Sequence, residues 1–175
     1  MKVIIRKISW ENPNSRGIPR DCADIMDYFN RAIDSSSYPL IPRYNKITIN
    51  EIKNIWISGK DKDITYVAYD PELDKVIGSA TLFVKKEKKL GELNVTVDPN
   101  YFNKKAGAEL VRAILEEAKK QGITVKIHTS VDNKAMQKIM EKLGHKPSQK
   151  IENFKEYKDK IIASCFDAYE YVINP

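Results

Sequence analysis

The stretch VTVDPNYFNKKAGAEL, residues 95–110, decides the fold of this chain. It opens with β-branched residues that favour a strand, and Pro99 ends that strand because proline has no N–H for a sheet ladder. A short basic loop follows and leads directly into an amphipathic helix. The first N–H groups of a helix lack partners within it, and the helix dipole places partial positive charge there. The loop and the helix start therefore suit an anion such as a phosphate or pyrophosphate.

Clear helix and strand signals continue on both sides of this stretch. The helix predicted over 106–120 has one apolar ridge and ends before Gly122, which suits the left-handed conformation after a last turn. A strand is predicted over 123–131, and Asp132 or Asn133 caps a further helix that closes at Gly144. The segment 155–162 is predicted to be a loop or a short helix. The other predicted elements are strands over 2–8, 64–69, 75–84, 92–97 and 165–173, and helices over 18–30 and from residue 50.

The order of these elements is strand, two helices, three strands, helix, strand, helix and strand. It predicts an α/β fold, with a mixed, mainly antiparallel sheet and helices on both faces. The chain has 175 residues, enough for one substantial core, and shows no internal repeat and no linker. We therefore expect one domain over residues 1–175.

Composition restricts the partners and the compartment. The net charge of +6 mildly favours anionic partners, but the basic residues are spread along the chain, so nucleic acid is not favoured. No apolar run approaches a membrane span, and the N-terminus lacks a signal-peptide core. Cys22 and Cys165 fit neither a metal spacing nor a disulfide framework. The sequence predicts a cytoplasmic protein with no metal and no membrane partner.

The segment from Val95 to Gly144 resembles the acyl-CoA-binding half of the GNAT superfamily of N-acetyltransferases. The family pattern is a strand ending Val-x-Pro, an Arg/Gln-x-x-Gly-x-Gly/Ala loop, a helix, a strand, and an Asn-opened helix ending Leu-Gly-Phe. Lys105 stands where that loop has its first glycine, and Met140 stands where many members carry a tyrosine that acts as general acid. The matching residues are Val97-Asp98-Pro99, Gly107, Leu110, Asn133, Met136 and Leu143-Gly144.

The resemblance implies a GNAT-like fold that binds acetyl-CoA as cosubstrate between two parallel strands that splay apart. The pantetheine arm would pair with the backbones of Val95 and Val97, as an added strand would. Because Lys105 replaces a glycine, we expect either a backbone conformation that glycine reaches more easily or a shifted loop. The remaining residues implied around the cofactor are Lys104, Ala106, Gly107 and Ala108 at the pyrophosphate, and Asn133 and Met136 beside the pantetheine.

The implied reaction is direct transfer of an acetyl group from the CoA thioester to a primary amine, which must lose a proton to attack. Two residues are candidates for proton transfer: Glu92, on the strand before the loop, and His128, on the splayed strand. Their other interpretations are an exposed strand residue and a surface or hydrogen-bonded histidine. The acceptor is a small molecule or a protein amino group, and a homodimer is left open. Two alternatives to the enzyme remain: a non-catalytic acyl-CoA-binding protein and a basic nucleic-acid or ribosome-binding module.

Overall fold

The structure is a computed structural model that describes residues 2–11, 13–15, 17–34, 48–102, 105–158 and 161–175. The strands are β1 (Ile4–Lys7), β2 (Ile64–Asp70), β3 (Lys75–Lys85), β4 (Leu90–Val97), β5 (Thr124–Ser130), β6 (Gln149–Lys158) and β7 (Ile161–Ile173). The helices are α1 (Arg20–Asp34), α2 (Ile49–Ile52), α3 (Ala106–Lys120) and α4 (Lys134–Lys142), with helical turns η1 (Lys53–Ile57), η2 (Lys86–Lys88) and η3 (Pro99–Tyr101). None of the helices in these ranges is both long and apolar enough to cross a bilayer.

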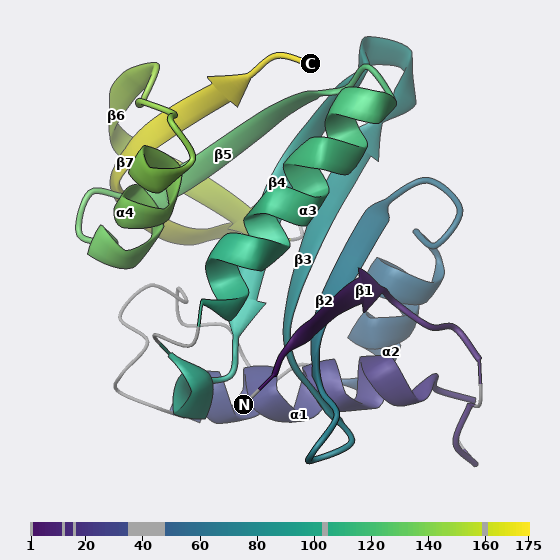
Figure 1. The fold of residues 1–175 in the computed structure, drawn as a ribbon. Coiled ribbons are helices and arrows are strands. Elements are labelled where there is room, and N and C mark those ends of the chain that lie inside the picture. Colours follow the sequence, from purple (N-terminus) through teal and green to yellow (C-terminus); the bar gives the residue numbers. More distant parts are fainter. Residues whose placement is uncertain (1, 12, 16, 35–47, 103–104, 159–160) are drawn as a thin grey trace.

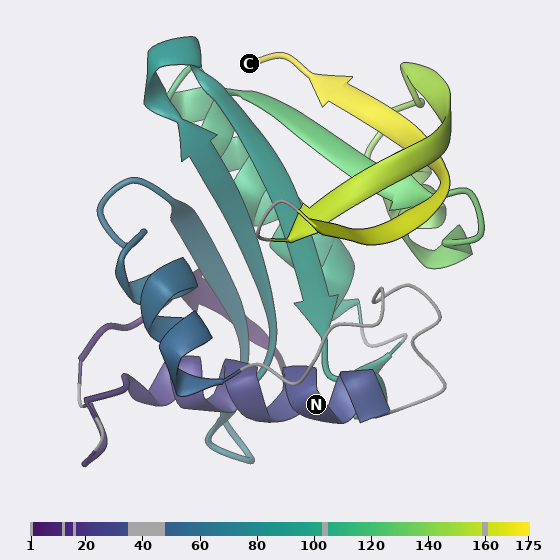
Figure 2. The same ribbon diagram turned by 180° about the vertical axis from the view of Figure 1, so that it is seen from behind.

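The described strands form one sheet in the order β1-β2-β3-β4-β5-β7-β6. Neighbouring strands are antiparallel, except for β4 and β5, which are parallel. Helices α3 and α4 lie on the face turned to the viewer in Figure 1, and α1 and α2 cover the face seen in Figure 2. The predicted fold class, a mixed and mainly antiparallel sheet with helices on both faces, is confirmed.

Each face of the sheet has its own apolar core, because successive side chains of a strand point to opposite faces. The core beneath α3 joins Leu82 and Leu93 of the sheet to Leu110 and Ile114 of the helix, and these four residues are at most 6% exposed. The core on the other face includes Ile25 and Tyr28 of α1 and, from the sheet, Val67 and Val76. The sheet therefore lies between two layers of helices and packs against both.

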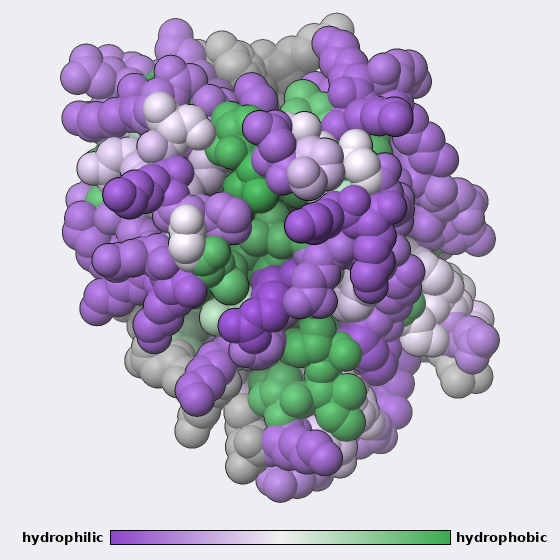
Figure 3. Space-filling view, turned by 45° about the horizontal axis from the view of Figure 1, so that its top comes forward, coloured by the Kyte–Doolittle hydropathy of each residue, from purple (hydrophilic) through white to green (hydrophobic). Residues whose placement is uncertain are grey.

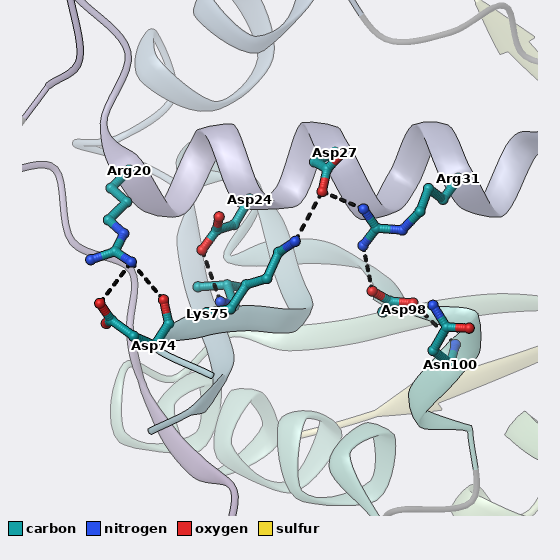
Figure 4. Close-up of polar contacts among 9 residues, drawn as sticks. Arg20, Asp24, Asp27, Arg31, Asp74, Lys75, Asp98 and Asn100 are labelled. Atoms are coloured by element: carbon teal, nitrogen blue, oxygen red, sulfur yellow. Dashed lines mark hydrogen bonds and ion pairs between the residues drawn. The ribbon is translucent and has the colours of Figure 1, made fainter. Parts of the chain in front are cut away.

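A row of charged side chains ties α1 to the ends of β3 and β4 (Figure 4). At the far end of the row, Arg31 donates from Nη2 to Oδ2 of Asp98 over 2.6 Å. The buried Asp98 carboxylate also accepts the backbone N–H of Asn100 over 3.0 Å, at the start of η3. Helix α1 is thus fixed to the point where the chain leaves β4 for α3. The other contacts of the row are Arg20 with Asp74, Asp24 with the N–H of Val76, and Asp27 with both Lys75 and Arg31.

The C-terminal part of the sheet differs from the sequence prediction. β6 and β7 pair as antiparallel strands, so the prediction of a loop or short helix over 155–162 was wrong for the described residues there. The register shifts between Ile151 and Phe154, and Asn153 has a φ of 52°. This bulge, with a second shift between Glu156 and Tyr157, places apolar residues three apart instead of two. The sequence spacing then looks helical although the backbone is a strand.

Candidate functional site

β4 and β5 form the one parallel pair of the described sheet, and they pair only at their beginnings. The paired residues are Leu90 with Thr124, Gly91 with Val125, and Glu92 with Lys126. β4 then runs on to Val97 and β5 to Ser130 while the two strands diverge, as Figure 1 shows. An unpaired strand edge offers backbone N–H and C=O groups to an extended ligand. The divergence therefore leaves such an edge on β4 within the sheet.

The start of α3 lies beside the wide end of this divergence. A Cβ built on Gly107 would lie 3.7 Å from Cγ2 of Val97 and 3.4 Å from Cδ1 of Ile139 on α4. The end of β4, the start of α3 and the face of α4 therefore meet at Gly107. Lys105 precedes the helix, and no side chain of the described residues caps the helix start. The N–H groups of the first turn are therefore left for an anion.

Lys105 has the left-handed backbone conformation that a lysine in place of a glycine requires, with φ of 62° and ψ of −7°. Ala106, next to it, is buried at 2% exposure, whereas Gly107 and Ala108 are half-buried. Lys104, the other lysine predicted at this loop, lies outside the described residues. The predicted residues Val95, Val97 and 105–108 thus belong to one region, the end of β4 and the beginning of α3.

The two predicted cofactor residues at the start of α4 have different structural roles. Asn133 is the N-cap of this helix, and its Oδ1 accepts the N–H of Met136 over 3.0 Å. Met136 is half-buried and packs against the core beneath α3. Met140 is fully buried, so the position of the family's tyrosine is filled by core packing. Hydrophobic side chains form a strip through the middle of the surface in Figure 3, with hydrophilic side chains on both sides.

The structure brings Glu92 and His128 together where the parallel pairing ends. Oε1 of Glu92 lies 3.0 Å from Nδ1 of His128. Glu92 pairs with Lys126, and His128 follows two residues later on the same face of β5. This face is the opposite one from that of Val95 and Val97, because side chains alternate along β4. The two predicted proton-transfer candidates are therefore neighbours, on the side of the sheet that α1 and α2 cover.

Three further residues of β6 and β7 complete this cluster, and sequence reasoning gave them no role in it. Nε2 of His128 lies 3.0 Å from Oε2 of Glu170. Gln149 donates to Oε1 of Glu170 over 2.8 Å. Phe154 stacks on the His128 ring, with centroids 4.5 Å apart. The one sequence feature that could have indicated this cluster was Glu170 itself, an acidic residue between Tyr169 and Tyr171 in a predicted strand.

The charges of the cluster shift its proton equilibria. The hydrogen bond with Glu92, supported by the one with Glu170, raises the pKa of His128 above its ordinary value, although burial opposes this. In return, the hydrogen bond with His128 holds the pKa of Glu92 below its usual value. Burial disfavours ionised Glu170, but hydrogen bonds from Gln149 and His128 outweigh it and the pKa of Glu170 is also lowered. These shifts favour the protonated form of His128 and the ionised forms of both carboxylates.

Comparison with known proteins agrees with this architecture. The sequence model of the acetyltransferase (GNAT) family matches residues 26–145, well over half of the chain. An N-acetyltransferase from Staphylococcus aureus Mu50 has a similar structure, with a TM-score of 0.76 and 21% identity over 99% of each chain. A proposed acetyltransferase from Salmonella typhimurium, solved with its cofactor acetyl-CoA, gives 0.75 and 16%, over 98% of this chain and 93% of the other. A ribosomal-protein-alanine N-acetyltransferase from Brucella melitensis gives 0.74 and 16%, over 98% and 99%. At these identities the structures show a shared fold, and the family match assigns the chain itself. The chain belongs to the acetyltransferase (GNAT) family.

Proposed function

We propose that this protein is an acetyl-CoA-dependent N-acetyltransferase that moves the acetyl group directly from the CoA thioester to a primary amine. One observation carries the proposal: β4 diverges from β5 beside an uncapped start of α3, and Glu92 and His128 meet where the divergence begins. This arrangement supports a cofactor on the β4 edge with proton-transfer groups beside it. We place the reaction in the cytoplasm, where the free thiols of Cys22 and Cys165 stay reduced.

In this proposal acetyl-CoA lies along the exposed edge of β4. The backbones of Val95 and Val97 hold the pantetheine amides, and Met136 contributes apolar contact from α4. The pyrophosphate lies at the N–H groups of residues 106–108, where the helix dipole and the Lys105 charge favour an anion. Lys104 belongs to the same proposed set. The acetyl-CoA in the Salmonella typhimurium neighbour supports this choice of cosubstrate.

The amine approaches from the opposite face of the sheet, where Glu92 lies. Its side chain is 59% exposed, and its lowered pKa keeps it ionised at neutral pH, ready to accept a proton. The amine nitrogen attacks the thioester carbonyl carbon, the C–S bond breaks, and the amine proton passes to Glu92. We propose only the class of the acceptor, a primary amine. The name of the Brucella melitensis neighbour gives one acceptor of this class, a ribosomal-protein alanine.

The test is product formation from acetyl-CoA and a panel of small amines and amino-terminal peptides, measured by mass spectrometry. Wild type should acetylate at least one of them. Glu92→Gln should bind acetyl-CoA as well as wild type in calorimetry, yet lower kcat/KM by about 10²–10⁴-fold, the usual contribution of a general base. Glu116→Gln, an exposed carboxylate of α3, is the matched control and should have no effect. Binding of acetyl-CoA with no acetylated product from any amine would favour a non-catalytic acyl-CoA-binding protein.

A further inference from the structure

Glu170 is the least expected member of the charged cluster. It lies directly opposite His128 in the antiparallel pair of β5 and β7. The residue is buried, at 7% exposure. Its Oε1 accepts from Gln149, and its Oε2 lies 3.0 Å from Nε2 of His128 and 3.4 Å from Nζ of Lys126. A buried carboxylate with contacts at both oxygens is held in one orientation.

The two contacts of His128 determine its protonation state. An ionised carboxylate only accepts hydrogen bonds, and a neutral imidazole donates from only one nitrogen. His128 faces Glu92 through Nδ1 and Glu170 through Nε2, each at 3.0 Å. Both contacts are satisfied together only when both ring nitrogens carry protons. The stacked Phe154 ring also favours the cation, because an aromatic face attracts positive charge.

The two carboxylates have different surroundings. The Glu92 side chain is 59% exposed, whereas that of Glu170 is 9% exposed. Glu92 is therefore accessible to a substrate, whereas Glu170 is largely shielded from solvent and contacts Glu92's partner His128. Among the described residues, the charged groups that face the unit are Lys126, which contacts Glu170 and also acts on Glu92, and Lys85, whose charge acts on Glu92.

We propose that Glu92, His128 and Glu170 form one proton-transfer unit in which Glu170 is the positioning residue. Glu170 keeps His128 doubly protonated and turned toward Glu92. This inference rests on the proposed acetyl transfer and adds the source of the proton that the buried Met140 cannot supply.

The protons balance within the unit. The amine nitrogen bonds to the carbonyl carbon as the C–S bond breaks, and the amine proton passes to Glu92. The sulfur leaves as a thiolate and takes a proton from the His128 imidazolium. Glu92 then returns its proton to His128 along the 3.0 Å contact. The net change is one proton moved from the amine nitrogen to the CoA sulfur, and the resting charges are restored.

The first measurement is an NMR pH titration of the ligand-free protein. The chain has two histidines, His128 and His145, so a His145→Gln variant assigns both ring signals. Glu170→Gln keeps the shape of the side chain and a hydrogen-bonding oxygen but removes the charge. It should lower the pKa of His128 by about one unit, the usual scale of one lost opposite charge. The control is Asp167→Asn, which removes one charge from the same strand but from a carboxylate that pairs with Lys150. It should leave the pKa of His128 unchanged.

The second measurement is the pH profile of kcat/KM with an accepted amine. Imidazolium is present below the pKa of His128 and is lost as the pH rises through it, so the profile should fall on its basic side at that pKa. In Glu170→Gln this basic limb should move to lower pH by the same amount as the NMR titration. Glu170→Asp keeps the charge on a shorter arm and should restore part of the shift. A basic limb that stays in place while the NMR titration moves would overturn the proposal.

Glu92→Gln, a change at an exposed position, provides a second test if Glu170→Gln does not fold. Glu170 then faces His128 alone, and the pKa of His128 should stay above the ordinary value of about 6.5. A pKa at or below that value would show that Glu170 does not hold the imidazolium. The NMR readout needs neither acetyl-CoA nor an amine. A His128 titration that is unchanged in Glu170→Gln therefore removes the role of Glu170 alone. The absence of any acetylated product from wild type removes the proposed function and the proton transfer with it.

Discussion

At the scale of single residues, Lys105 shows how one departure from a family pattern is accommodated. The family has a glycine at this position, and the lysine takes the left-handed conformation, with φ of 62°. That conformation costs an ordinary residue roughly 1–2 kcal/mol. The sequence predicted either this strain or a shifted loop, because the pattern identifies the position. We propose that the charge of Lys105 favours binding of the anionic cofactor and so compensates for the stability that this conformation costs.

Lys105→Gly should therefore have opposite effects on stability and binding. The free energy of unfolding should rise by about 1 kcal/mol as the strain is relieved. Acetyl-CoA should bind more weakly, and the loss should shrink at high salt because the lost interaction is between exposed charges. Chemical denaturation and calorimetry at low and high salt measure the two effects.

Lys89→Gly is the matched control, since Lys89 is also left-handed, with φ of 44°, but lies in the turn between β3 and β4. It should gain similar stability with no change in binding. Equal loss of affinity in both variants would remove Lys105 from the cofactor site.

At the scale of elements, the junction of β4 with α3 and α1 positions the proposed cofactor loop. Gly107 is the residue through which α3 contacts the end of β4 in this junction. A Cβ there meets Ile139 and Val97 at ordinary van der Waals distances, so Gly107→Val should fold. The branched side chain would crowd the contacts of α3 with Val97 and Ile139, beside the loop proposed for the cofactor. Binding of acetyl-CoA should weaken by roughly tenfold, about 1.4 kcal/mol, in calorimetry. Ala135→Val, on an exposed part of α4, is the control, and equal affinities of the two variants would contradict the placement.

The ion pair of Arg31 and Asp98 connects α1 to the end of β4 in the same junction. Asp98 is 3% exposed and Arg31 is 39% exposed, so Arg31→Gln leaves a buried carboxylate without its cation. The free energy of unfolding should fall by about 2 kcal/mol. The double variant Arg31→Gln/Asp98→Asn should lose less than the sum of the two single losses, since neither charge is then unpaired.

The control for this pair is Arg112→Gln, which breaks an exposed pair with Glu109 on α3. Its effect should stay within about 0.5 kcal/mol. Additive losses at Arg31 and Asp98 in urea denaturation would show that the two side chains act independently, and that α1 does not fix the end of β4 through this pair.

The elements also show which parts of the fold can be predicted from the sequence. The strand before Pro99, helix α3 and the cap at Asn133 were predictable, because each depends on residues close together in the chain. β6 was not, because its bulge at Asn153 breaks the alternation by which a strand is identified. The role of Glu170 depends on that same region: its partner His128 is set by strand pairing across 42 residues, which no local pattern contains. Glu92 and His128 were predicted one by one, but their contact was not.

At the scale of the whole molecule, the sheet separates two layers of helices, and we propose that each substrate approaches from one side of it. Helices α3 and α4 lie on one face, and α1 and α2 lie on the other (Figures 1 and 2). In the proposed mechanism acetyl-CoA comes from the α3 side, the amine comes from the α1 side, and the divergence of β4 from β5 joins the two. The basic charge of the chain, +6, adds a general attraction for the anionic cofactor.

We propose that acetyl-CoA occupies this divergence, and amide chemical-shift mapping is the clearest test of that placement. Acetyl-CoA is added to the isotopically labelled protein, and backbone N–H signals are followed by two-dimensional NMR. We expect the largest shifts at Val95, Val97 and residues 105–108, with a smaller response at His128. Shifts confined to other surfaces, with these residues unchanged at saturation, would contradict it.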